Sequence, residues 1–75
     1  MTDEVLDAKG LNCPLPILKS KKTLKKMESG GLLEVHATDP GATADFEAFC
    51  RLTGCEMVES SEDDGVYKFV IKNTG

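Results

Sequence analysis

The stretch that most constrains the fold runs from Gly10 to Pro16 and reads GLNCPLP. A short apolar run, Val5–Ala8, precedes it, and a segment with helical periodicity, Ile17–Glu28, follows it. Gly10 allows a tight turn after a strand. Pro14 suits the first position of a helix, because its fixed φ matches the helix and its missing N–H would have no intrahelical partner there. The sequence therefore predicts a strand-to-helix turn, with Cys13 just before the helix.

A cysteine at a helix start has altered chemistry. The positive end of the helix dipole and the free N–H groups of the first turn favour an anion, and thiols in such places typically have a pKa of about 3.5 to 7.5 instead of about 8.5. Pro14 and Pro16 lack N–H groups, so Leu15 and Ile17 are the remaining donors of the first turn. Two interpretations stay open: Cys13 is a reactive thiolate, or it is a small buried residue at a turn marked by prolines.

The rest of the chain alternates between strand and helix patterns. Leu32–Thr38 alternates apolar and polar residues, with Leu33, Val35 and Ala37 on one face and Glu34 and His36 on the exposed one. Further along the chain the patterns predict a helix from Gly41 or Ala42 to Leu52, an edge strand Cys55–Ser60, a turn Glu62–Gly65, a strand Val66–Lys72 and a frayed tail Asn73–Gly75. The predicted order is β-α-β-α-β-β.

This order predicts an α+β fold, a two-layer α/β sandwich in which two helices cover one face of a four-stranded mixed sheet. The first strand, helix and second strand form a right-handed unit with parallel strands. On the second helix, the predicted inward stripe consists of Ala42, Phe46, Phe49, Cys50 and Thr53. On the first helix it consists of Ile17, Leu24 and Met27, with Leu18 at its edge.

Length and charge limit the class of protein. With 75 residues the chain is expected to form one domain, residues 1–75, with its chemistry at the surface, because a domain this small has little room for an internal cavity. No apolar run reaches the roughly 20 residues that span a bilayer, and the acidic start Met1–Glu4 is unlike a signal peptide, so a cytoplasmic protein is expected. The net charge of −4 disfavours direct binding to nucleic acid.

The three cysteines form no CxxC pair, and no second Cys or His lies near Cys13 at metal-ligand spacing. We therefore expect free thiols in a reducing compartment, no metal and no cofactor. A thiol redox enzyme is a further hypothesis, against which the missing CxxC pair counts. Cys50 on the inward stripe is read as a packed core residue, and Cys55 at a strand start as a structural one. The alternative for either is a second reactive or resolving thiol.

Two further features have both a structural and a functional interpretation. Five lysines cluster on the first helix and are either a solvated face or a docking surface for an acidic partner: Lys19, Lys21, Lys22, Lys25 and Lys26. Asp39 is either only the N-cap of the second helix, with Pro40 as its first residue, or both border the Cys13 surface, since both helices start at the same end of parallel strands. A small regulatory module that docks through the lysines, with Cys13 unreactive, remains an alternative function.

The motif resembles the G-x-x-C-P-x-P signature of the TusA (SirA-like) sulfur carrier proteins. The resemblance extends over almost the whole chain, in length and in order of elements. It implies that Cys13 carries sulfane sulfur as a persulfide, with Gly10, Asn12, Pro14 and Pro16 completing the motif. It also implies a sulfurtransferase-type carrier that works between proteins, taking sulfur from a cysteine desulfurase or rhodanese-like donor and passing it to an acceptor protein. A monomer suits such a relay.

Two motif positions differ from many relatives that serve tRNA thiolation. Such relatives often have Arg before the cysteine and an acidic residue between the prolines, where this chain has Asn12 and Leu15. The difference favours dissimilatory sulfur oxidation or general sulfur trafficking over synthesis of tRNA 2-thiouridine or of the molybdenum cofactor.

Overall fold

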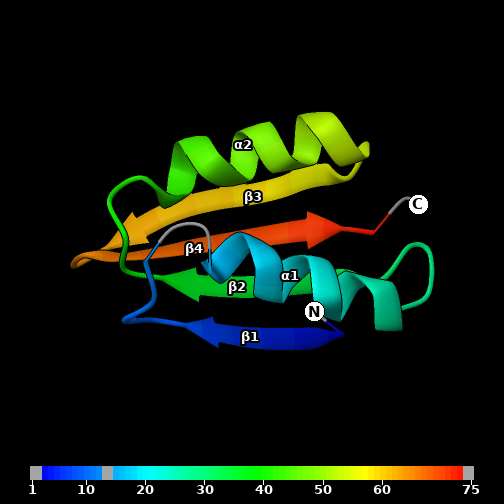
Figure 1. Cartoon of the computed structure of the whole chain (residues 1–75), viewed down its shortest axis with the longest axis horizontal. Coiled ribbons are helices and arrows are strands. Elements are labelled where there is room, and N and C mark those ends of the chain that lie inside the picture. Colours follow the sequence, from blue (N-terminus) through cyan, green and yellow to red (C-terminus); the bar gives the residue numbers. More distant parts are fainter. Residues whose placement is uncertain (1–2, 13–14, 74–75) are drawn as a thin grey trace.

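The computed structural model describes residues 3–12 and 15–73. Their elements, in chain order, are β1 (Glu4–Ala8), α1 (Leu15–Lys26), β2 (Leu32–Ala37), α2 (Ala42–Thr53), β3 (Glu56–Asp63) and β4 (Val66–Lys72). The four strands form one sheet in the order β1-β2-β4-β3, with β1 parallel to β2 and the other pairs antiparallel. Both helices lie on the same face of this sheet (Figure 1). The predicted two-layer α+β architecture is confirmed, and β3 is an edge strand as expected.

The largest differences from the predicted helix and strand boundaries are in α1 and at the end of β3; the other boundaries agree to within one residue. α1 begins at Leu15 and ends at Lys26, two residues earlier at each end, because Pro16 fits within the first turn. β3 runs to Asp63, three residues further than expected, because its polar second half pairs with β4 although it buries nothing. Asp64 and Gly65 both have positive φ, 53° and 82°, as the predicted Asp-Gly hairpin turn requires.

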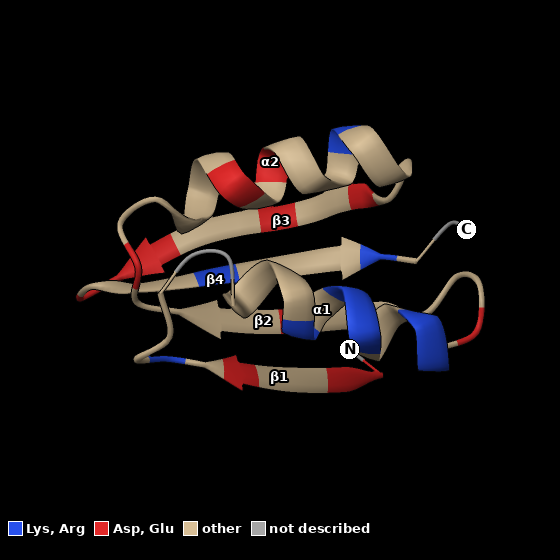
Figure 2. Cartoon of the chain, in the orientation of Figure 1, with Lys and Arg blue, Asp and Glu red and all other residues tan. Residues whose placement is uncertain are grey.

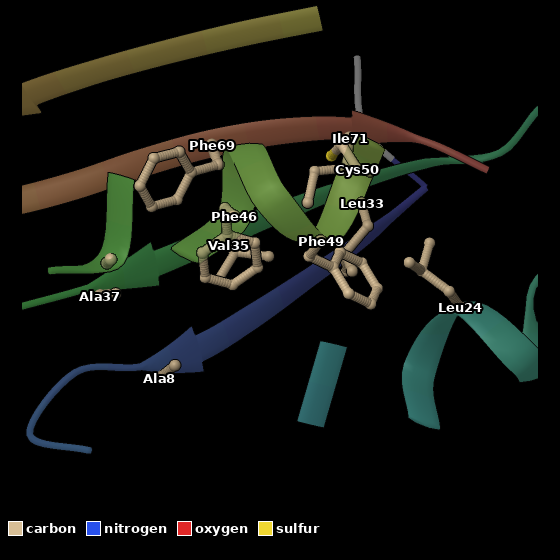
Figure 3. Close-up of a cluster of buried hydrophobic side chains, with 11 residues drawn as sticks. Ala8, Leu24, Leu33, Val35, Ala37, Phe46, Phe49, Cys50, Phe69 and Ile71 are labelled. Atoms are coloured by element: carbon tan, nitrogen blue, oxygen red, sulfur yellow. The ribbon is translucent and has the colours of Figure 1, made fainter. Parts of the chain in front are cut away.

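The core lies between the sheet and the helices, and Figure 3 shows its main side chains. The predicted inner face of β2 is confirmed, since its three inward residues are fully buried. Phe46 of α2 stacks on Phe69 of β4, with ring centroids 4.8 Å apart, and meets Phe49 edge to face at 6.3 Å. Thr53 is exposed, contrary to its predicted place on the inward stripe; it is the last residue of α2 and its hydroxyl donates to the Phe49 carbonyl oxygen.

The inward stripe of α1 was only partly predicted. Pro16, Ser20 and Leu24, spaced four residues apart, are its buried residues. The Ser20 hydroxyl donates to the Pro16 carbonyl oxygen at 2.8 Å, so a polar side chain is satisfied within the core. Because this stripe is centred on Ser20, Leu18 is turned outward and is 53% exposed.

Asn73 is a structural residue and not part of a frayed tail. It is 6% exposed, and its side-chain amide donates to the carbonyl oxygens of Leu24, Met27 and Glu28 at 3.1, 3.1 and 3.3 Å. These carbonyls lie in the last turn of α1 and directly after it, where Leu24 O also accepts the Met27 N–H and Glu28 O accepts the Gly31 N–H. Asn73 therefore joins the last strand to the C-terminus of α1.

No helix within residues 3–12 and 15–73 combines the length and the apolar character needed to cross a membrane.

Candidate functional site

Two loops lie side by side at one end of the sheet. Ala8 pairs with Ala37, so β1 and β2 end level with each other and the loops that follow them leave from the same place (Figure 1). Gly10 has φ of +81°, and its N–H donates to the Thr38 hydroxyl oxygen at 2.9 Å. The loop with the GLNCPLP motif is therefore attached to the loop that contains Asp39 and Pro40. Their role as the rim of a Cys13 surface stays a prediction.

Cys13 and Pro14 lie outside the described residues. On either side of them Asn12 is exposed and Leu15, the first residue of α1, is 46% exposed. The Leu15 N–H donates to the Asn12 carbonyl oxygen at 2.9 Å, so one of the two backbone donors expected to face an anion is already engaged. Stabilisation of an anion ahead of α1 therefore depends mainly on the helix dipole. The first turn of α1 has no acidic residue, and Lys25 and Lys26 lie in its last turn, where cations complement the dipole.

Asp39 is not the N-cap of α2. The N-cap is Gly41, and the helix begins at Ala42. The Asp39 carboxylate accepts a hydrogen bond from the Gly41 N–H at 3.1 Å, and its carbonyl oxygen accepts one from Ala42 at 2.9 Å. Asp39 and Pro40 thus form a turn ahead of the helix. The predicted helix start at Gly41 or Ala42 is confirmed, but the assignment of Asp39 as N-cap and Pro40 as first helical residue is wrong.

The outer surface of α1 is basic and apolar together. All five predicted docking lysines are exposed, as are Leu15 and Leu18. Figure 2 shows the positive charges gathered on α1, with acidic residues over β1, β3 and α2. An open hollow of about 500 Å³ is lined by Leu15, Leu18, Lys19, Lys21, Lys22 and Lys25. The hydrophobic pattern had assigned Leu18 to the edge of the core, so sequence reasoning missed the apolar part of this surface.

None of the five lysines of α1 forms an ion pair with another described residue, so they are available to a partner. The ion pair among the described residues joins His36 and Glu34 on β2, with 2.5 Å between Nε2 and Oε2. The hydrogen bond from His36 holds the pKa of the Glu34 carboxyl below its usual value, and Lys68 adds to the effect. Both side chains of the pair lie on the helix-free face, where His36 was expected, so the pair is remote from α1.

Cys50 and Cys55 lie at the other end of α2. Cys50 is 7% exposed within the core, and Cys55 is half-buried against it. Burial, with a smaller contribution from Cys55, raises the pKa of the Cys50 thiol to about 11. α2 spans about 18 Å at 1.5 Å per residue, so Cys55 lies roughly a helix length from Asp39. This geometry supports the structural reading of both residues and disfavours a resolving role toward the motif loop.

Cys50 is expected to resist alkylation in the folded protein. Its pKa is raised above the ordinary value of 9.0, so the folded state holds the thiol proton up to about pH 11. The contribution of this protonation to the free energy of unfolding is fully present below pH 9 and is lost as the pH rises through about 11. Iodoacetamide at pH 8 followed by peptide mass mapping should label Cys50 only after unfolding in urea. Equal labelling of Cys50 with and without urea would contradict this.

Comparisons with known proteins decide the family. The sequence profile described as Sulfurtransferase TusA matches residues 4–73. A sulfur carrier protein TusA of Allochromatium vinosum is 57% identical over 72 residues, which cover 96% of this chain and 95% of the relative. The chain belongs to the TusA family. The resemblance inferred from the motif is therefore confirmed, and with it the general role of a sulfur carrier that has donor and acceptor proteins as partners.

Further relatives agree with this TusA assignment. A putative sulfur carrier protein of Bacillus subtilis, YrkI, is 46% identical over 71 residues, 95% of each chain. The crystal structure of a SirA-like protein from Desulfitobacterium hafniense superimposes with a TM-score of 0.83 at 26% identity, covering 96% of this chain and 99% of that one. The fold and the family are thus supported by independent comparisons.

Proposed function

We propose that this TusA-family chain accepts sulfane sulfur as a persulfide on Cys13 and relays it to an acceptor protein. The observation that carries the proposal is the CPxP cysteine itself, which precedes the first residue of α1 by two positions in a family of sulfur carriers. A carrier needs a reactive thiol at the surface and no deep pocket, because its substrate is a sulfur atom on another protein. A small two-layer domain leaves little room for a deep pocket, and the position of Cys13 in the sequence, ahead of α1, supports a reactive thiol.

The transfer is an exchange reaction at sulfur. The Cys13 thiolate attacks the outer sulfur of the donor's persulfide; a new S–S bond forms on Cys13, the donor's S–S bond breaks, and the donor thiolate leaves with the electron pair. The acceptor thiolate then attacks the outer sulfur on Cys13 in the same way. Both steps conserve the oxidation state of the transferred sulfur, so no external oxidant or reductant is needed. The α1 dipole favours the anionic thiolate before loading and the anionic persulfide after it.

The exposed lysines and leucines of α1 support the second part of the proposal, which concerns docking. A donor of the cysteine desulfurase or rhodanese-like class, or an acceptor protein, would meet α1 with an acidic surface that also covers Leu15 and Leu18. Asn12 and Leu15 favour a partner in sulfur oxidation or trafficking over one in tRNA thiolation or molybdenum cofactor synthesis. A monomer in the cytoplasm suits such a relay.

The docking proposal predicts that charge reversal on α1 slows transfer. The double variant Lys19→Glu with Lys22→Glu should lower the second-order rate constant for loading by about tenfold or more, because steering by charge changes association rates by 10 to 10³. It should also weaken the salt dependence of that rate. The measurement is stopped-flow or quenched transfer from a loaded donor at low and high salt.

A matched control separates a local surface from net charge. Lys68→Glu with Lys72→Glu makes the same change in charge on β4. In the sheet register these two lysines lie opposite His36 and Leu32 of β2, on the helix-free face. This control should leave the rate within about twofold. Equal losses in both double variants would mean that only overall charge matters, and docking through α1 would be wrong.

A relay experiment tests the proposed function directly. A cysteine desulfurase carrying radiolabelled persulfide is mixed with the chain, and an acceptor with a low-pKa thiol is then added. Label should appear on the wild type, leave it when the acceptor is added, and never appear on Cys13→Ser. If the wild type takes up no label but binds a partner through its lysines, the chain is an interaction module and the carrier proposal fails.

A further inference from the structure

The Thr38 side chain attaches the described part of the motif loop to the end of β2. Thr38 follows directly on β2, a central strand whose last residue, Ala37, is fully buried and pairs with both Ala8 and Tyr67. The Thr38 hydroxyl oxygen accepts the Gly10 N–H at 2.9 Å, across 28 positions of sequence. This hydrogen bond fixes the position of the motif loop relative to β2, whereas contacts within the loop fix only the shape of the loop itself.

Two further hydrogen bonds among the described residues 7–11 are short-range. The Lys9 N–H donates to the Asp7 carboxylate at 3.1 Å, and the Leu11 N–H donates to the Ala8 carbonyl oxygen at 3.2 Å. These bonds shape the chain around Gly10 but do not attach it to the neighbouring loop. The φ of +81° at Gly10 favours glycine because other residues are strained in this conformation, although a Cβ there would meet nothing within 4 Å. This backbone conformation directs the Gly10 N–H to Thr38.

We infer that Thr38 is a positioning residue that holds the Cys13 loop for transfer, an inference that rests on the proposed role of Cys13. A threonine is stiff at χ1, so its hydroxyl oxygen is held in place by the strand that precedes it. In-line attack on a partner's sulfur depends on alignment, and a displacement of about 1 Å at the reacting atoms costs as much as 10²-fold in rate. Gly10 lies three residues before Cys13, close enough in the chain for loss of its anchor to move the thiol.

The hydrogen bond between Gly10 and Thr38 is expected to contribute little to the free energy of unfolding, so its effect on transfer can be measured separately. Thr38 is exposed, and a Gly10 N–H freed of its partner would bind water. Thr38→Val has nearly the same shape but cannot accept the hydrogen bond. It should therefore unfold at nearly the wild-type temperature, while its transfer rate at saturating loaded donor falls about tenfold.

The experiment measures transfer from a persulfide-loaded cysteine desulfurase as a function of donor concentration, in the full chain. We expect Thr38→Val to lower the saturating rate with little change in the half-saturating concentration. Thr38→Ser, which restores the acceptor oxygen, should recover most of the rate. Thr53→Val is the matched control, because the Thr53 hydroxyl bonds only near its own helix end, to Phe49 O and the Cys55 N–H; it should transfer at the wild-type rate.

Three results would overturn the inference. They are an unchanged saturating rate in Thr38→Val, a loss confined to the half-saturating concentration, and a loss that Thr38→Ser does not recover. A Cys13→Ser arm separates this from the proposed function: if that variant still takes up sulfur, Cys13 is not the carrier residue. If it does not, and Thr38→Val transfers normally, only the positioning inference fails.

Discussion

Cys13→Ser is expected to reduce sulfur acceptance to the background of the assay while the chain stays folded. A serine hydroxyl has no anionic form near neutral pH and does not attack a persulfide, so the nucleophile is removed and the size of the side chain is nearly kept. The measurement is the rate of sulfur transfer from a loaded donor, together with the midpoint of thermal unfolding.

The other two cysteines provide the controls for this variant. Cys50→Ala removes a core thiol whose pKa is raised, and Cys55→Ser changes a half-buried thiol at the far end of α2. Both should accept sulfur at nearly the wild-type rate, although Cys50→Ala leaves a small cavity and should unfold at a lower temperature. Normal sulfur uptake by Cys13→Ser, or its loss in Cys55→Ser alone, would assign the chemistry to a different thiol.

Phe46→Ala should bring the chain close to unfolding. Phe46 is fully buried and contacts both Phe49 and Phe69, so it connects α2 to β4 at the centre of the core. Truncating a buried phenylalanine costs about 3 to 5 kcal/mol. A domain of this size has a free energy of unfolding on the order of 4 to 11 kcal/mol. Urea denaturation followed by circular dichroism should show a large drop in the midpoint.

Leu52→Ala is the matched control for Phe46→Ala, because Leu52 lies on the same helix and is 86% exposed. Its substitution should change the free energy of unfolding by no more than about 0.5 kcal/mol. Similar losses in the two variants would mean that the Phe46 cluster does not hold the two layers together.

The fold was predictable where local patterns carry the information. The alternation along β2 assigned its buried face, and the Asp64-Gly65 turn located the last hairpin. The patterns did not predict burial where small polar residues take the place of apolar ones in the core. Ser20 is buried because its hydroxyl bonds to its own helix, and Asn73 because it caps a helix that lies 45 to 49 positions earlier. Neither contact leaves a periodic signal in the sequence.

The candidate site shows the same division. The motif identified Cys13 as the residue of interest and placed it ahead of a helix, which begins at Leu15. The hydrogen bond between Gly10 and Thr38 depends on the parallel pairing of β1 with β2. The exposure of Leu18 depends on how α1 packs against the core. Both are consequences of tertiary packing, so the residues around the motif could be inferred from sequence but their contacts could not.

The most direct test of the central claim is the intact mass of the reduced wild-type chain after incubation with a sulfane-sulfur donor. The proposal predicts a gain of one sulfur atom, removed by reductant and located on Cys13 by peptide mapping after alkylation. No gain in mass, or a gain located on Cys50 or Cys55, would contradict Cys13 as the site that carries the sulfur.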